Sequence, residues 1–473
     1  MLTHCVILVA LCLGISTGLP TKETTCDLPQ ALRDEIQGYK PVVNKIIESI
    51  VNGEFKGDTF RSLNTFIDKF GARMAGGPVL EKSIDYLLNE FNTLGLHNAY
   101  TEDAIIPHWV RGKESATLLS PRSKDLPILG LGTTVGTPKG GFTAEIVVVE
   151  SFDELKALPD DQVRGKIVVY AEKWLGSYGD TVAYRSGSVE AAKKGAIASL
   201  IRSITQFSIA SPHTGSQYYQ AGVRKIPTAC ITVEDAEMLL RMYKSGETVR
   251  IHLEMEDYNF ENTLSRNTFV EIQGREKKNT SVVVVSGHLD SWDVGVGAMD
   301  DAGGCWISWK SVEYLTKLGL VPRRTIRAAL WTAEEEGIWG AKHYMTTHKD
   351  NEKEEFNLFM ESDSGTFDPI GLDFSGTPEA QCIFKEVLTL MEPLNATKFV
   401  TPGGGPDINQ WVDRGFPGAS LINANDRYFW FHHTQGDSMM IENPESLDKG
   451  TALFAATAYV IADLSVDLPK DVK

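Results

Sequence analysis

The sequence predicts an α/β protein in which helices flank a central sheet, and two observations carry this prediction. First, the β-branched run Val282–Val285 has the composition of a strand that is buried on both faces of a sheet. Apolar residues at helical spacing follow it in Ala302–Leu318. Second, strand-like segments recur at Arg324–Trp331, Phe356–Met360 and Gly418–Asn423, and acidic or histidine residues come after each of them. We therefore expect the polar residues to gather beyond one edge of the sheet.

The N-terminus has the pattern of a secretory signal peptide over residues 1–18. An apolar run from Cys5 to Ile15 is too short to span a bilayer, and small residues follow it up to Gly18. Because no Lys or Arg precedes this run, a buried N-terminal helix is the alternative. The sequons at Asn279 and Asn395 predict glycosylation, which fits secretion or residence in the lysosome, endoplasmic reticulum or Golgi.

Composition narrows the classes of function. The net charge of −17 argues against nucleic acid or an anionic membrane as a partner, and no segment is long enough to cross a bilayer. Four cysteines remain after the signal peptide, and their spacing fits no zinc motif and is too sparse for a disulfide scaffold. We expect buried free thiols at all four positions, which are Cys26, Cys230, Cys305 and Cys382.

At 473 residues the chain is long enough for two domains. Its first part is predicted to hold amphipathic helices over Asp27–Asn52 and Pro78–Leu96, separated by a glycine-rich loop at Gly71–Gly77 that carries no visible chemistry. Residues 19–44 could in part be a pro-segment of a zymogen, and the sequence does not decide this.

The character of the chain changes between residues 125 and 257. Short strands are predicted at Ala144–Val149, Lys166–Tyr170 and Ala229–Ile231, together with one helix at Val189–Lys194. No cluster of His, Asp and Glu occurs here, so we expect a separate domain without catalytic residues.

The residues that could carry chemistry lie after residue 258. Two neighbouring zinc ions need a bridging carboxylate and further nitrogen or oxygen ligands for each ion. The available set is His288, Asp300, Glu335, Asp363 and His433. Manganese and cobalt also accept these ligands, and we expect zinc because the chain is predicted to be secreted. The remaining acid, Glu334, could take a proton from an attacking water.

Each of these motifs has an ordinary structural explanation when it is taken singly. The pair His288 and Asp290 could be a helix cap beside a surface histidine, and Glu334–Glu336 could be a solvated helix start. Asp363 could lie in a turn, and His432–His433 could belong to an aromatic cluster. These explanations do not account for all the motifs in this order.

Together the motifs resemble those of co-catalytic zinc exopeptidases, the group that contains bacterial leucyl aminopeptidases and glutamate carboxypeptidase. The matching segments are His288–Asp290, Gly297–Gly304, Trp331–Gly337, Glu361–Asp363 and His433–Thr434. The resemblance implies a mixed central sheet flanked by helices, formed by residues 45–124 and 258–473. Residues 125–257 resemble a protease-associated domain, which is β-rich and inserted into the peptidase. This resemblance implies a role as a lid or in substrate access, and the alternative is an ordinary second lobe without a function of its own.

The resemblance also implies roles for single residues. His288 and Asp363 would be the terminal ligands of one zinc ion, Glu335 and His433 those of the other, and Asp300 would bridge them. Glu334 matches the general base, Asp290 matches an acid that orients His288, and the Asp300–Asp301 peptide bond is expected to be cis.

The chain departs from the resemblance at two positions. Relatives often carry Tyr before the last ligand, where this chain has His432, so we hypothesise that His432 donates a hydrogen bond to the tetrahedral intermediate. Relatives often have Gly-Ser-Asp or Gly-Thr-Asp where this chain has Gly405-Pro406-Asp407. That loop could line the substrate pocket, or Asp407 could cap a helix.

The sequence therefore predicts a metallo-exopeptidase with two zinc ions per chain that hydrolyses dipeptides or C-terminal peptide bonds, and by resemblance a homodimer. One alternative is an aminopeptidase with the same metal ligands. A second is a catalytically inactive, receptor-like relative, and a third is a cyclotransferase of the same fold that binds one zinc ion.

Overall fold

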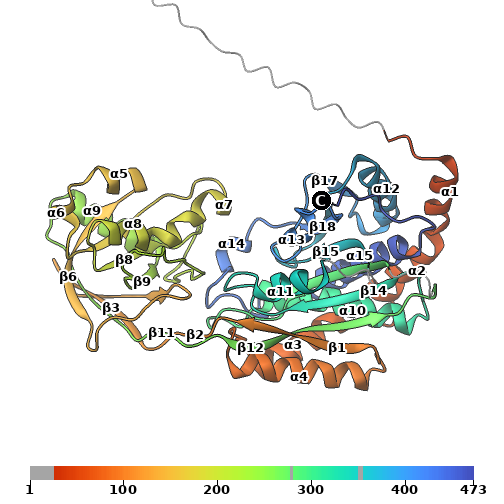
Figure 1. The fold of residues 1–473 in the computed structure, drawn as a ribbon, viewed down its shortest axis with the longest axis horizontal. Helices are drawn as coiled ribbons and strands as arrows, with labels where there is room; N and C mark the ends of the chain where they lie inside the picture. The colour runs from red at the N-terminus through yellow and green to blue at the C-terminus, as the bar shows by residue number, and fades with distance from the viewer. Residues whose placement is uncertain (1–25, 277–280, 350–354, 473) are drawn as a thin grey trace, which may run out of the picture.

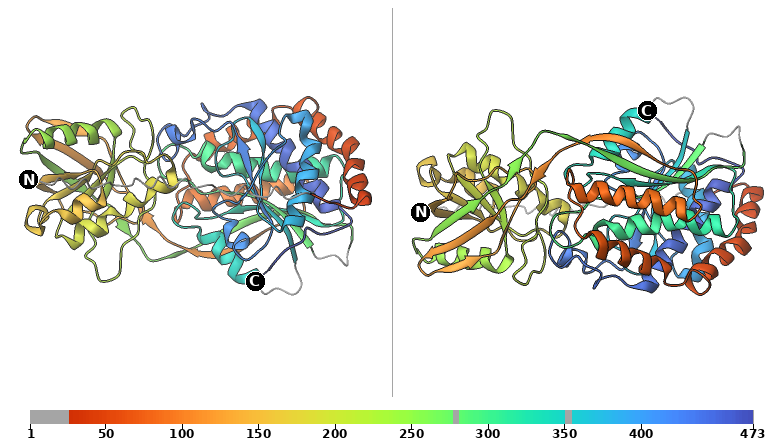
Figure 2. Two further views of the ribbon diagram at one scale, coloured as in Figure 1. Left: turned by 90° about the horizontal axis from the view of Figure 1, so that it is seen from above. Right: turned by 90° about the horizontal axis from the view of Figure 1, so that it is seen from below.

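The computed structural model describes residues 26–276, 281–349 and 355–472. The predicted signal peptide and the sequon at Asn279 therefore lie outside the described residues. The described chain forms two lobes, each built around an eight-stranded sheet (Figure 1). The lobes lie end to end and are joined by a narrow neck (Figure 2). A short antiparallel pair in the neck consists of β2 (Trp109–Val110) and β11 (Tyr258–Asn259).

The larger lobe contains residues 26–106 and 263–472 and confirms the predicted mixed α/β architecture. We call it the catalytic lobe because it carries all the residues that the sequence analysis proposes for catalysis and metal binding. Four neighbouring strands in its centre are parallel, and antiparallel pairs flank them. In spatial order the strands are β1 (Ala99–Ile106), β12 (Thr263–Ile272), β14 (Thr325–Trp331), β13 (Ser281–His288), β15 (Glu355–Glu361), β18 (Gly418–Asn423), β16 (Pro369–Asp373) and β17 (Lys398–Val400).

Strand β13 lies in the middle of this sheet, and all of its residues are buried. Val283 and Val285 belong to one apolar cluster and Val282 and Val284 to another, because successive side chains of a strand point to opposite faces. The strand predicted from Val282–Val285 is therefore confirmed, and helices cover both of its faces.

The helices of the catalytic lobe surround the sheet (Figure 1). The N-terminal helices are α1 (Gln30–Gly38), α2 (Lys40–Val51), α3 (Asp58–Phe70) and α4 (Pro78–Thr93). The later helices are η2 (Ala298–Ala302, a π-turn), α10 (Gly303–Lys317), α11 (Trp339–His348), α12 (Pro378–Leu388), η3 (Thr389–Leu394), α13 (Asn409–Val412), α14 (Tyr428–Phe431) and α15 (Pro444–Asp463). Of the described helices, none is both long and apolar enough to cross a membrane.

The single helix predicted over Asp27–Asn52 is wrong, because the structure divides it into α1 and α2 at Tyr39. Pro41 occupies the first turn of α2. Proline has no backbone N–H to continue the preceding helix, and it is well placed in the first turn of a new one.

The smaller lobe, which we call the inserted lobe, contains residues 114–255. Its strands in spatial order are β4 (Lys124–Leu126), β3 (Glu114–Ser120), β10 (Arg250–Met255), β6 (Phe142–Val149), β7 (Ile167–Tyr170), β8 (Ala198–Arg202), β9 (Thr228–Ile231) and β5 (Ile128–Gly130). Because β3 pairs with β10, this sheet begins before the boundary expected at residue 125.

The inserted lobe contains more helix than the sequence predicted. Its helices are α5 (Phe152–Ala157), α6 (Asp160–Val163), α7 (Tyr178–Thr181), η1 (Val182–Ser186, a 3₁₀ turn), α8 (Gly187–Lys193) and α9 (Val233–Lys244). Only α8 was predicted. The start of α9 has a sequence signal, because the Thr232 hydroxyl accepts a hydrogen bond from the Asp235 amide at 3.0 Å.

The prediction of four free thiols is wrong for two of them. Cys26 and Cys382 form a disulfide with a Cα–Cα distance of 5.3 Å, which joins the segment before α1 to α12. The pairing was not apparent because 356 residues separate the two cysteines in sequence. Cys230 and Cys305 are buried free thiols, as predicted.

Candidate metal centre

The side chains predicted to bind metal meet where the parallel strands of the catalytic lobe end. His288 is the last residue of β13, and Glu334 and Glu335 follow β14. Asp363 follows β15, while His433 comes after β18 and α14. Because these four strands are parallel neighbours, their carboxyl ends share one edge of the sheet, as expected.

The carboxylate of Asp300 lies between the two histidines of this group. Its Oδ1 is 3.2 Å from His288 Nε2, and its Oδ2 is 3.2 Å from His433 Nε2. Asp363 Oδ1 is 3.5 Å from the same nitrogen of His288, and Glu335 Oε2 is 2.9 Å from that of His433. The centre therefore has two halves that share Asp300, which we call the His288 half and the His433 half.

The turn that carries Asp300 is held by a carboxylate that the sequence analysis did not single out. The Asp300–Asp301 peptide bond is cis, as the resemblance implied. The side chain of Asp437, 3% exposed, accepts hydrogen bonds from the amides of Ala298, Met299 and Asp300 at 3.0, 2.9 and 3.2 Å. Its position four residues after His433 was the available signal, since it places Asp437 in the same loop as a candidate ligand.

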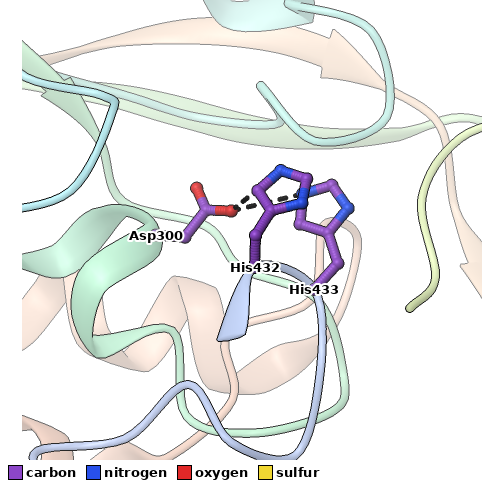
Figure 3. A group of neighbouring side chains, drawn as sticks. All are labelled: Asp300, His432 and His433. Atoms are coloured by element: carbon purple, nitrogen blue, oxygen red, sulfur yellow. Dashed lines mark ion pairs between the residues drawn. The ribbon is translucent and has the colours of Figure 1, made fainter. Parts of the chain in front are cut away.

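His432 also points toward the centre. Its ring stacks on that of His433, with centroids 3.5 Å apart and planes at 19°. Its Nε2 lies 3.6 Å from Asp300 Oδ2, so both histidines face the same oxygen (Figure 3). Ligand atoms of Asp300, His432 and His433 lie within 4.8 Å of one another, as do those of His288, Asp300 and Asp363. His432 therefore does more than pack in an aromatic cluster, because its ring nitrogen faces the carboxylate of Asp300.

Asp290 supports the centre in a different way from the one predicted. The ring nitrogen Nδ1 of His288 lies 3.0 Å from the carbonyl oxygen of Asp290 and 3.7 Å from its carboxylate. The carboxylate instead accepts hydrogen bonds from the amides of Glu334 and Glu335 at 3.0 and 3.3 Å. Asp290 therefore orients His288 through its backbone and fixes the Glu334 turn through its side chain.

The glycine-rich loop before α4, which showed no chemistry in the sequence, supplies a buried arginine. The guanidinium of Arg73 donates hydrogen bonds to the carbonyl oxygens of Leu289, Val296 and Gly297 at 2.7, 2.7 and 2.8 Å. A further bond goes to the carbonyl of Gly71 at 2.8 Å. Arg73 thus fixes both ends of the loop between β13 and Asp300, and a lone arginine among small residues gave no signal of this.

The hydrogen-bonded pairs in the centre shift the pKa values of its members. Burial favours the neutral form of Asp300, but hydrogen bonds with His288 and His433 outweigh it and hold the pKa well below its usual range. Burial lowers the pKa of His433, but Glu335 and Asp300 outweigh it and raise this pKa to about 9. Burial also lowers the pKa of His288, but Asp363 and Asp300 outweigh it and raise this pKa well above its usual range. Each half therefore surrounds an imidazole with carboxylates that favour a positive charge there.

Glu334 and His432 are shifted toward their neutral forms. Burial raises the pKa of the Glu334 carboxyl well above its usual range, and the nearby carboxylates of Asp363 and Glu335 add to this shift. Burial lowers the pKa of His432 well below its usual range, and His433 lowers it further. A positive charge bound in the centre would favour the ionised form of Glu334.

A cavity of about 380 Å³ opens next to the centre, between the two lobes. The catalytic lobe contributes Glu334, Lys342 and Pro406 to its lining, and the inserted lobe contributes Tyr178 and Arg185. The loop 403–407 therefore lines this cavity through Pro406.

Asp407 does not cap a helix. The first turn of α13 begins after Ile408 and has no side-chain cap. The carboxylate of Asp407 is fully buried without a hydrogen-bond partner among the described residues, and its amide donates to Glu361 at 3.2 Å.

Comparison with known proteins identifies the family. The model of peptidase family M28 matches residues 267–458. Carboxypeptidase Q of Mus musculus is 49% identical over 440 residues, which are 93% of this chain and 93% of that protein. This chain belongs to peptidase family M28. It is accordingly a metallopeptidase.

Solved structures agree with the M28 assignment. A peptidase M28 precursor from Shewanella amazonensis superposes with a TM-score of 0.86 at 32% identity, covering 93% of this chain and 100% of that one. BSAP, a zinc aminopeptidase from Bacillus subtilis, has a TM-score of 0.66 at 21% identity and covers 89% and 99% of the two chains. The likeness to BSAP shows the shared fold alone.

Proposed function

We propose that this M28 peptidase uses two zinc ions and hydrolyses dipeptides or C-terminal peptide bonds. The observation that carries the proposal is the position of Asp300, whose two carboxylate oxygens each face one histidine. The terminal ligands would be His288 and Asp363 in one half and Glu335 and His433 in the other. Imidazole nitrogens and carboxylate oxygens without thiolates are a suitable donor set for zinc.

Bound zinc ions would polarise the scissile carbonyl and make a nearby water more acidic. Glu334 would take the proton of the attacking water and pass it to the leaving amine. Its Oε2 lies 4.0 Å from His288 Nε2, and its side chain faces the cavity. The neutral ring of His432 would donate an N–H to the developing oxyanion. Among the described residues its buried Nδ1 has no hydrogen-bond partner.

The preference for a carboxypeptidase or dipeptidase rests on Arg185, which presents a positive charge to the cavity. The side chain is only 4% exposed, and its Nε has no hydrogen-bond partner among the described residues. Its Nη1 donates to the Tyr178 hydroxyl at 2.5 Å. Nη2 donates to the carbonyl oxygen of Thr214 at 2.6 Å, so each terminal nitrogen of Arg185 keeps one further N–H group. Through these two groups Arg185 would hold the free carboxylate of a substrate.

The Arg185 assignment can be tested with Arg185→Lys, which keeps the positive charge and loses the paired N–H groups of the guanidinium. We expect KM for substrates with a free C-terminal carboxylate to rise about tenfold or more, because lysine offers the carboxylate only a single point of contact. Among the described residues that line the cavity, Lys342 is the other lysine or arginine, so Lys342→Met is the matched variant. If KM rises in Lys342→Met and stays unchanged in Arg185→Lys, the substrate carboxylate is bound by Lys342 instead.

Product analysis separates the proposed activity from that of an aminopeptidase. Zinc-loaded protein is given a free dipeptide, its N-acetylated form and its C-amidated form, with and without a chelator. Chelator-sensitive cleavage that tolerates acetylation but not amidation means a carboxypeptidase, and cleavage of the free dipeptide alone means a dipeptidase. The reverse tolerance means an aminopeptidase and would refute the assignment. No cleavage by protein that holds two zinc ions would favour the inactive, receptor-like alternative, and one bound ion would favour the cyclotransferase.

Secretion or lysosomal residence, glycosylation and a homodimer stay predictions. Asn395 is exposed, as a glycan acceptor must be.

A further inference from the structure

We infer that the inserted lobe completes the His433 half of the metal centre, so that zinc binding in this half and docking of the inserted lobe stabilise each other. The inference rests on the proposed two-zinc function and goes beyond substrate access as the role of this lobe. It is carried by one segment of the inserted lobe, residues 213–216, which follows β8 and contacts both the loop after α14 and the turn after β14.

The central contact joins Thr214 to His433. The ring nitrogen Nδ1 of His433 donates to the carbonyl oxygen of Thr214 at 3.0 Å, and the Thr214 amide donates to the carbonyl of His433 at 3.1 Å. Arg185 donates to the same Thr214 carbonyl at 2.6 Å, which holds this acceptor in place. All three residues are at least 90% buried.

Two further contacts lie on either side of this pair. His213 donates from Nδ1 to the carbonyl oxygen of His432 at 2.8 Å. The Ser216 hydroxyl donates to the carbonyl oxygen of Glu335 at 2.6 Å. The inserted lobe therefore contacts the backbone of Glu335 and of His433, the two proposed terminal ligands of the His433 half. It also contacts the backbone of His432, which directly precedes His433.

The bond to Thr214 has a specific consequence for metal binding. A histidine that binds metal through one ring nitrogen usually donates from the other to an oxygen, and this bond fixes its tautomer and its direction. For His433 this oxygen belongs to the inserted lobe. If the lobe moved away, His433 would lose that bond.

The orienting bond of the His288 half does not involve the inserted lobe. The corresponding bond of His288 goes to the carbonyl of Asp290 at 3.0 Å, within the catalytic lobe. Displacement of the inserted lobe would leave this bond in place. The coupling is therefore selective, and by linkage zinc in the His433 half must also favour the docked position of the lobe.

The test is zinc binding by the full-length double variant His213→Phe/Ser216→Ala, which removes both side-chain contacts and leaves every proposed ligand. Zinc affinity at each position is measured by competition with a chelator. We expect one of the two affinities to fall about 10–100-fold and the other to stay unchanged. The control is Ser199→Ala, because the Ser199 hydroxyl bonds to Thr228 at 2.9 Å inside the inserted lobe, and both affinities should persist. Ser216→Ala alone gives a milder variant should the double variant fold poorly.

Amide hydrogen exchange in the wild-type protein supplies a readout that is independent of variants and of activity. Removal of zinc should accelerate exchange at Thr214, whose N–H bonds to His433, and should leave the amides of β7 unchanged. The inference would be overturned, and the two-zinc function kept, if the wild type binds two zinc ions while the folded double variant shows both affinities unchanged or equally reduced. A wild type that binds one ion would refute the two-zinc function and the inference with it.

Discussion

The two halves of the candidate metal centre contain the same donor types but are held by different parts of the chain. His288 is oriented by the carbonyl of Asp290, two residues away in the same loop. His433 is oriented by the carbonyl of Thr214, which is distant in sequence and lies in the other lobe. Asp300 belongs to both halves and is fixed by Asp437 within the catalytic lobe. Proposed ligands that all belong to one lobe can thus still depend on another lobe for their direction.

The largest effect is expected from Glu334→Gln, which leaves both halves of the centre intact. Loss of the base should lower kcat about 10²–10⁴-fold, measured on a free dipeptide, while zinc stoichiometry stays unchanged. Glu336→Gln is the matched control, since burial raises the pKa of Glu336 to about 8 and the neutral amide resembles its protonated form. Equal kcat values for the two variants would show that Glu334 is not the general base.

His432→Phe distinguishes an oxyanion donor from a ligand in the His433 half. As a donor, His432 should contribute about 10²–10³-fold to kcat, and its loss should leave zinc affinity unchanged. Its Nε2 is 3.6 Å from Asp300 Oδ2, so a weaker zinc affinity would instead make it a ligand. Unchanged turnover would refute the hypothesis.

Asp437→Asn should affect both halves, in contrast to the inter-lobe contacts. The carboxylate of Asp437 accepts three amide hydrogen bonds through its two oxygens, whereas the amide of asparagine has one oxygen that can accept. Because Asp300 serves both halves, we expect both zinc affinities to fall about 10–100-fold, measured by chelator competition. A loss confined to one affinity would show that the halves do not share Asp300 as proposed.

The smallest effect is expected from Arg73→Lys, which acts on the loop of the His288 half. A lysine cannot reach all the carbonyls that the guanidinium contacts, so the free energy of unfolding should fall by about 1–3 kcal/mol. Denaturant unfolding measures this. The control is Arg266→Lys, whose ion pairs with Glu81 and Asp85 lie nearer the surface and should contribute under about 1 kcal/mol. Equal losses would contradict a special role for Arg73.

Sequence reasoning succeeded where local patterns determine structure. The valine run of β13 and the polar residues after β14, β15 and β18 indicated the sheet edge at which His288 and Asp363 meet. It failed for contacts between distant segments. Nothing in the sequence near Arg73 or Thr214 indicates that each contacts the loop of a candidate ligand, because such contacts depend on tertiary packing. Sequence reasoning also missed that the carbonyl oxygen of Asp290 orients His288, because every residue has a backbone carbonyl and its contacts cannot be recognised from the sequence.

The disulfide between Cys26 and Cys382 determines what cleavage at the end of segment 19–44 would do. Ile36 of α1 and Val43 of α2 are fully buried in the main apolar cluster, and the disulfide anchors the segment before them. Cleavage after residue 44 would therefore produce a nicked, two-chain molecule rather than release a peptide. The cleaved enzyme should run as one band on a non-reducing gel and lose a short fragment only when reductant is added.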